Sequence, residues 1–176
     1  MLVDLPTPTI THQGWPWTIE TELPSDSETN NWPRISIITP SYQQGKFLEE
    51  CLRSVLLQNY PNLEFIVMDG GSSDESPAIL SRYDQHLSYW QSKTDGGQAQ
   101  AINSGFERAT GEILCWLNSD DFLLPGALFT VAQKFMEQHC DVVYGDALNL
   151  HEPDYEYDYW QGYWVIPSFL QFGGIL

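Results

Sequence analysis

The sequence is short of basic residues and of long apolar runs. Its 176 residues hold 7 lysines and arginines against 24 aspartates and glutamates, a formal net charge of −17. A surface of that sign repels phosphate backbones and anionic lipid headgroups, which excludes nucleic acid as an expected partner. No run approaches the roughly 18 apolar residues of a transmembrane helix, and the N-terminus lacks a signal-peptide pattern. We therefore expect a protein without a transmembrane segment, in the cytoplasm or peripheral to the inner face of the membrane.

Cysteines are also few. Cys51, Cys115 and Cys140 are odd in number and follow no metal-ligand spacing. We expect three buried or half-buried thiols in a reducing compartment. Apolar residues make up 42% of the chain and aromatic residues 14%, which is typical of a globular protein rather than a disordered one. The length suits one domain with a proper core.

Hydrophobic patterning divides the chain into an arm and a domain. Residues 1–33 are rich in proline, threonine and acids, and predict an irregular arm held to the domain by Trp15, Trp17 and Trp32. From Arg34 onward, strand-like and helix-like segments alternate. Strands are expected over 34–39, 63–68, 87–92, 113–117 and 142–150. Helices are expected over 47–56, after a cap at 72–74, after 95–98, and over 125–138.

This alternation predicts an α/β fold. Strand and helix lengths match β–α units, so we expect three layers, with a mostly parallel (mixed) sheet covered by helices on both faces. In such sheets, ligands bind outside the carboxyl ends of the strands. The segments at those ends read TPSYQQG, DGGSSD, TDGGQ and NSDD, and all are polar or acidic. The sequence therefore predicts one polar site built from four loops.

The polar loops do not match a dinucleotide site. The first β–α turn reads PSYQQGKF and lacks the G-x-G-x-x-G cradle, and there is no Walker motif. Adjacent Asp120 and Asp121 can instead offer hard oxygen ligands to Mg²⁺ or Mn²⁺, which would hold a diphosphate in place of basic residues. The alternative is that these aspartates cap the helix that starts near Pro125. A haloacid-type phosphatase is disfavoured, because its paired aspartates follow the first strand.

Two segments carry a family resemblance. TPSYQQGKFLEECLRSVLLQNYPNLEFIVMDGGSSD, followed by DGGQAQAINSGFERATGEILCWLNSDD, resembles the family 2 glycosyltransferases of the GT-A fold. The resemblance runs from Arg34 to about Asn149. It implies a nucleotide-sugar-binding domain over 34–150, with 151–176 as the start of an incomplete acceptor-side segment.

The resemblance also implies roles for individual residues. Asp121 would coordinate the metal, with Asp120 contacting the metal or a ribose. Asn118 stands at the first position of the D-x-D signature, where it has one formal charge fewer than the family's aspartate. The other residues implied to contact the nucleotide sugar are Pro40, Ser41, Tyr42, Asp69, Asp95, Gly97 and Asn103. Tyr42 would stack on a uracil-like base, and Asp69 would accept its N3–H.

The implied activity is inverting, metal-assisted transfer of a sugar from a nucleotide diphosphate, most often UDP, to a glycan or lipid-linked acceptor in polysaccharide biosynthesis. The catalytic base is expected beyond Leu176; Asp146 and His151 are weaker candidates. Two alternatives stay open: a catalytically incomplete nucleotide-sugar-binding fragment, and a divalent-cation or nucleotide-binding module. The aromatic residues between Tyr155 and Phe172 predict an exposed patch that favours self-association.

Overall fold

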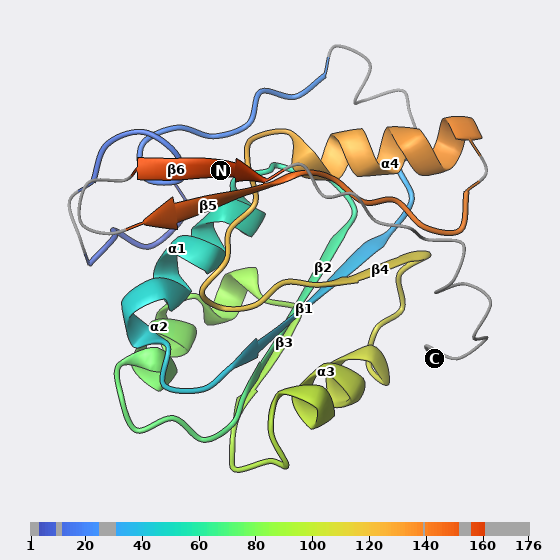
Figure 1. The fold of residues 1–176 in the computed structure, drawn as a ribbon. Helices are drawn as coiled ribbons and strands as arrows, with labels where there is room; N and C mark the ends of the chain where they lie inside the picture. Colours follow the sequence, from blue (N-terminus) through green and yellow to red (C-terminus); the bar gives the residue numbers. More distant parts are fainter. Residues whose placement is uncertain (1–3, 10–11, 25–30, 139, 152–155, 161–176) are drawn as a thin grey trace.

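The structure, a computed structural model, describes residues 4–9, 12–24, 31–138, 140–151 and 156–160. Its elements follow one another as strands and helices joined by short loops (Figure 1). In chain order they are β1 Ile35–Ser41, α1 Gly45–Leu56, β2 Leu63–Asp69, α2 Ser76–Arg82, the 3₁₀ helix η1 Asp84–His86, β3 Tyr89–Ser92, α3 Gln98–Phe106, β4 Ile113–Trp116, α4 Ala127–Gln138, β5 Ala147–His151 and β6 Glu156–Trp160.

The main sheet has four strands in the order β3-β2-β1-β4, and every neighbouring pair is parallel. The predicted α/β fold with a parallel sheet is therefore confirmed. The prediction of a strand over 142–150 was wrong in its bounds and in assigning that strand to the main sheet. It begins at Ala147 and pairs antiparallel with β6 in a separate hairpin, because Gly145 and Asp146, which are poor strand formers, interrupt the run.

The central strands are buried on both faces. All seven residues of β1 are buried, since alternate side chains enter two different cores. Ile35 and Ile37 join the larger core, which α1, α2 and α4 cover, whereas Ile38 joins a smaller one under α3. The apolar stripe of α1, with Leu48, Leu52 and Val55, packs into the larger core. The expected coverage of both faces is thus observed (Figure 1).

Gly105 lets α3 lie close against β1. A Cβ atom added there would meet Cγ2 of Ile38 at 2.4 Å, so any larger side chain would push the helix away. This close approach carries the first turn of α3 toward the carboxyl end of β1. It therefore fixes one wall of the site described below.

The exposure of the cysteines differs from the expectation. Cys51 is buried and Cys140 half-buried, but Cys115 is exposed. Cys115 lies on β4, which among the described residues pairs only with β1, so one edge of this strand is open. Among the described residues, no helix combines the length and hydropathy that a membrane crossing requires.

A buried carboxylate ties the amino-terminal ends of three strands together. Glu64 of β2 accepts hydrogen bonds from the hydroxyl groups of Ser36 and Thr110, from the backbone N–H of Thr110, and from the guanidinium of Arg34. Burial acts to raise the pKa of Glu64, but these donors outweigh it and the net pKa is lowered. The charged form is therefore the stabilising one.

Replacing Glu64 should remove this contribution. A carboxylate whose folded pKa is lowered stabilises the fold above the ordinary glutamate pKa of about 4.3, and the effect is lost as pH falls through the folded pKa. Glu64→Gln should lower the free energy of unfolding by about 1–3 kcal/mol at pH 7 and flatten its decline below pH ~5. Urea unfolding between pH 3 and 7 measures both effects. Glu107→Gln, at an exposed position, is the control, and parallel pH profiles for Glu64→Gln and the parent would contradict the assignment.

Candidate functional site

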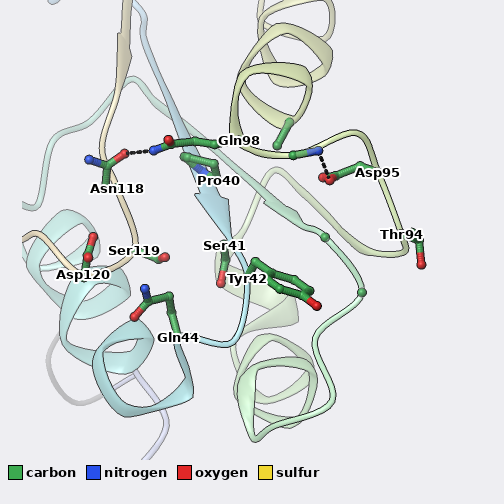
Figure 2. Close-up of a pocket in the computed structure, with 14 residues that line it drawn as sticks. Pro40, Ser41, Tyr42, Gln44, Thr94, Asp95, Gln98, Asn118, Ser119 and Asp120 are labelled. Atoms are coloured by element: carbon green, nitrogen blue, oxygen red, sulfur yellow. Dashed lines mark hydrogen bonds between the residues drawn. The ribbon is translucent and has the colours of Figure 1, made fainter.

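A polar cavity of about 510 Å³ opens at the carboxyl ends of the parallel strands. The four polar loops singled out in the sequence all contribute to its wall (Figure 2). Its lining residues are Pro40, Ser41, Tyr42, Gln44, Gly70, Gly71, Thr94, Asp95, Gly97, Gln98, Ala101, Asn118, Ser119 and Asp120. No lysine or arginine is among them, so this wall offers a phosphate no basic side chain.

The loop after β1 presents an aromatic ring. Tyr42 is 63% exposed, a high value for a tyrosine, and lies beside the cavity (Figure 2). The next residue, Gln43, has the left-handed φ of 56°. Two serines hold it there, since the Gln43 N–H donates to Ser72 Oγ at 2.8 Å and its side-chain amide to Ser73 Oγ at 3.0 Å. The loops after β1 and β2 are therefore fixed to each other.

The loop after β2 leaves space at the cavity floor. Gly70 lies between Tyr42 and Asp95, and an added Cβ atom would meet Cδ2 of Tyr42 and Oδ1 of Asp95, each at 3.3 Å. Any larger side chain at position 70 would crowd both neighbours. The absence of a side chain thus keeps the face of the tyrosine open toward the carboxylate.

Asp69 is fully buried and is not among the residues that line the cavity. Its carboxylate accepts hydrogen bonds from the backbone N–H groups of Gly71 and Ser72 and from the hydroxyl groups of Ser72 and Ser92. These bonds shape the turn that carries Gly70. Asp69 therefore fixes the backbone that carries the lining residues Gly70 and Gly71.

The start of α3 forms the wall opposite the acidic loop. Asp95 accepts a hydrogen bond from the N–H of Gly97 at 2.8 Å and so shapes the turn before the helix. Gly97 has a φ of 97°. Gln98, the first residue of α3, extends across the cavity and donates from Nε2 to Oδ1 of Asn118 at 2.8 Å (Figure 2).

Asn118 links this wall to the paired carboxylates. While its Oδ1 accepts from Gln98, its Nδ2 donates to Oδ2 of Asp121 at 3.3 Å. Burial raises the pKa of Asp121, and the charge of Asp120 raises it further, whereas the hydrogen bond from Asn118 works in the opposite direction. An amide at position 118 therefore stabilises the charged form of Asp121, which an aspartate at this position, with no N–H to donate, could not do.

Comparison with known proteins fits this geometry. The sequence matches the glycosyl transferase family 2 over residues 36–171. The chain belongs to glycosyltransferase family 2. It is 37% identical over 123 residues to glycosyltransferase GlyG of Streptococcus pneumoniae, covering 68% of this chain and 41% of the relative. It is 34% identical over 120 residues to a GalNAc(5)-diNAcBac-PP-undecaprenol β-1,3-glucosyltransferase of Campylobacter jejuni, covering 66% of this chain and 38% of the relative.

Two solved structures resemble the family 2 fold of this chain. Staphylococcus aureus TarS (residues 1–349), in complex with UDP-GlcNAc, has a TM-score of 0.56 and 28% identity over 60% of this chain and 32% of its own. The mannosyltransferase PcManGT from Pyrobaculum calidifontis, in complex with GDP-Man and Mn²⁺, has a TM-score of 0.54 and 26% identity over 64% of this chain and 37% of its own. The predicted GT-A fold is confirmed. The present chain spans about two fifths or less of the length of these four relatives.

Most residues that the resemblance selected do meet at the cavity. Those that line it are Pro40, Ser41, Tyr42, Asp95, Gly97, Asn118 and Asp120. Asp69 and Asp121 are not part of the lining, although Asp121 is hydrogen-bonded to the lining residue Asn118. Asn103 is exposed on the second turn of α3 and is not part of the lining. The individual roles of these residues remain predictions.

Gln44, Thr94, Gln98 and Ser119 line the cavity but were not singled out in the sequence. For Gln98 a signal was present, because it ends the polar TDGGQ segment, directly before the predicted helix. Gln44 and Ser119 also lie in predicted polar loops, TPSYQQG and NSDD, but nothing in the sequence distinguishes them from their neighbours there.

The acidic loop fits a divalent cation that is shared with a ligand. Among the described residues no group of three or more histidine, cysteine, aspartate and glutamate side chains could hold a metal alone. Asp120 and Asp121 nevertheless provide two adjacent carboxylates, and Mg²⁺ sites are commonly built from one or two carboxylates plus substrate phosphates. Burial and, to a lesser extent, the charge of Asp120 raise the pKa of Asp121, and a cation here would offset both effects.

Changing Asn118 to aspartate should strengthen the response to metal. The new carboxylate cannot donate to Asp121 and adds a third negative charge, so Asn118→Asp should lower the metal-free free energy of unfolding by about 1 kcal/mol. Added Mn²⁺ should then raise the Tm of the variant more than that of the parent, because the ion neutralises a larger charge. Thermal unfolding with and without Mn²⁺ measures this difference. Gln133→Glu, at an exposed position of α4, controls for added charge, and equal Mn²⁺ shifts in parent and Asn118→Asp would refute the expectation.

Proposed function

We propose that this domain binds the donor of an inverting, metal-assisted glycosyl transfer, with a UDP-sugar as the donor. One observation carries the proposal: the cavity at the strand ends is lined by the exposed Tyr42 and by Asp120, whose neighbour Asp121 is hydrogen-bonded to the lining residue Asn118, and no basic side chain is part of the lining. A nucleoside diphosphate needs a stacking surface for its base and a cation for its phosphates. The complexes of TarS with UDP-GlcNAc and of PcManGT with GDP-Man and Mn²⁺ support this assignment.

The base would lie against Tyr42. Its ring is exposed, and the missing side chain at Gly70 leaves room between it and Asp95. Base–aromatic stacking contributes about 1–3 kcal/mol. For Asp69 to accept the N3–H of a uracil, the base would have to displace a hydroxyl donor, either Ser72 or Ser92, from its carboxylate. Asp95, Gly97 and Asn103 would lie toward the ribose and the sugar.

The diphosphate would lie toward the acidic loop. Asp120 and Asp121 would hold Mg²⁺ or Mn²⁺, which when bound supplies positive charge to the departing diphosphate. Gln98 and Asn118 would orient the loop through their hydrogen bond. The Asn118 amide would also keep Asp121 charged, and so ready to bind a cation.

In the transfer itself, an acceptor hydroxyl would lose its proton to a base and attack the anomeric carbon. A new C–O bond would form as the bond to the diphosphate breaks on the opposite face, which inverts the anomeric configuration. We propose a glycan or lipid-linked acceptor, in keeping with the undecaprenol-linked glycan that the name of the Campylobacter relative specifies. The base is not assigned to a described residue.

Binding of UDP should depend on both the metal and Asp121. In calorimetric titration, the 176-residue protein should bind UDP in the presence of Mn²⁺ and at least about tenfold more weakly without it, a difference of ~1.4 kcal/mol. Asp121→Ala should bind UDP equally weakly with and without Mn²⁺, because the metal has lost a ligand. Asp141→Ala, at an exposed position away from the cavity lining, should behave like the parent.

Two results would count against the proposal. Equal UDP affinity with and without Mn²⁺ would mean that the aspartates hold no catalytic metal. Equal affinities for UDP and for uridine would mean that the diphosphate does not contribute to binding, and would favour a simple nucleotide-binding module.

A further inference from the structure

We propose that Trp15, in the N-terminal arm, is a positioning residue for the loop that carries Asp120 and Asp121. This inference rests on the proposed donor site, because the loop in question carries the two aspartates proposed to bind the metal. Trp15 contacts that loop although the two are 108 residues apart in sequence. The indole Nε1–H of Trp15 donates to the backbone carbonyl of Leu123 at 2.7 Å. Leu123 lies two residues after Asp121, so the contact holds the backbone of the acidic loop itself.

Besides the arm, a row of polar side chains on α1 also contacts the acidic loop. Cys51, Ser54 and Gln58 recur at helical spacing on one face of α1 and its C-terminal extension. Their partners are all backbone groups of the loop: Cys51 Sγ lies 3.5 Å from the Asn118 carbonyl, the Leu123 N–H donates to Ser54 Oγ at 3.1 Å, and Gln58 Nε2 donates to the Leu124 carbonyl at 2.9 Å.

The two sets of bonds converge on one residue. Leu123 donates its N–H to Ser54 of α1, while its carbonyl accepts from Trp15 of the arm. A second arm residue extends the hold, since the Gly126 N–H donates to Thr21 Oγ1 at 3.1 Å. The loop is thus hydrogen-bonded to both the helix and the arm before any ligand is present, which is how a site is preorganised.

The arm can only serve this role if its own place is fixed. Arg53 of α1 is 2% exposed, and its guanidinium donates to the carbonyls of Pro6, Pro16 and Trp17 at 3.0–3.1 Å. A buried cation without these acceptors would be costly. Arg53 therefore holds the arm on both sides of Trp15, and Figure 1 shows the blue arm running beside α1.

The buried Glu49 adds a second anchor. It accepts hydrogen bonds from the backbone N–H of Thr9 at 3.0 Å and from Arg82 at 2.8 Å. Charged groups of α1 therefore hold the arm in place. Through its hydrogen bond to Leu123, Trp15 in turn holds the acidic loop at a fixed position relative to the arm. The side chain of Trp15 is only half-buried, so its hydrogen bond can be removed without emptying the core.

The test compares two identical substitutions in the arm. Trp15→Phe removes the N–H that reaches Leu123, whereas Trp17→Phe removes an indole N–H two residues away that does not reach the loop. Hydrogen exchange of the ligand-free protein should show about fivefold faster exchange at the amides of Asp121, Leu123 and Gly126 in Trp15→Phe only. In the presence of Mn²⁺, UDP affinity should fall by a similar factor in Trp15→Phe and stay at the parental value in Trp17→Phe.

Each outcome decides the inference. Unchanged loop exchange in Trp15→Phe, or a UDP affinity equal to that of Trp17→Phe, would overturn it. If the parent protein fails to bind UDP, the proposed function fails, while the exchange measurement still tests whether Trp15 holds the loop. Should Trp15→Phe not fold, Thr21→Val takes its place, because it removes only the acceptor of the Gly126 N–H and should loosen the same loop.

Discussion

The structure depends on the parallel pairing of β1 with both β2 and β4. Because all the strands of the main sheet run the same way, every loop that follows a strand emerges at one edge. Pairing on two sides and packing on two faces bury the whole of β1. The core therefore determines where Tyr42, Asp95 and Asp120 meet, although none of them belongs to it. Gly105 matters for the same reason, since it sets how close α3 comes to this central strand.

Two adjacent carboxylates in the acidic loop make its charged state unfavourable, and a bound cation would make that state more favourable. Burial raises the pKa of Asp121, and repulsion from Asp120 adds to the rise. Asn118 reduces that rise with one hydrogen bond, while α1 and the arm hold the backbone in place. The loop is thus hydrogen-bonded on two sides and negatively charged, beside a cavity whose lining has no basic side chain. In a family 2 glycosyltransferase, this is the arrangement that a metal–diphosphate pair would complete.

Much of this could be predicted from local sequence. Short apolar runs predicted β1 to β4, helical patterns predicted α1 to α4, and the rule for parallel sheets predicted the site at the carboxyl ends of the strands. What escaped prediction depends on contacts between distant residues. Nothing near Gln98 or Trp15 in sequence indicates that they meet Asn118 and Leu123. The buried Asp69 accepts hydrogen bonds from two serines, one of them 23 residues away on β3. The expected aromatic patch between Tyr155 and Phe172 lies outside the residues whose side chains are described, and stays a prediction.

The most direct test of the central claim is a crystal structure of this chain with UDP and Mn²⁺. The account predicts the base against Tyr42, the diphosphate at the acidic loop, and a metal ion bound by oxygens of Asp120 or Asp121 and of the diphosphate. Leu123 should keep its hydrogen bonds to Trp15 and Ser54 in that complex. UDP bound elsewhere, or bound in this cavity with its diphosphate directed away from the two aspartates, would contradict the account.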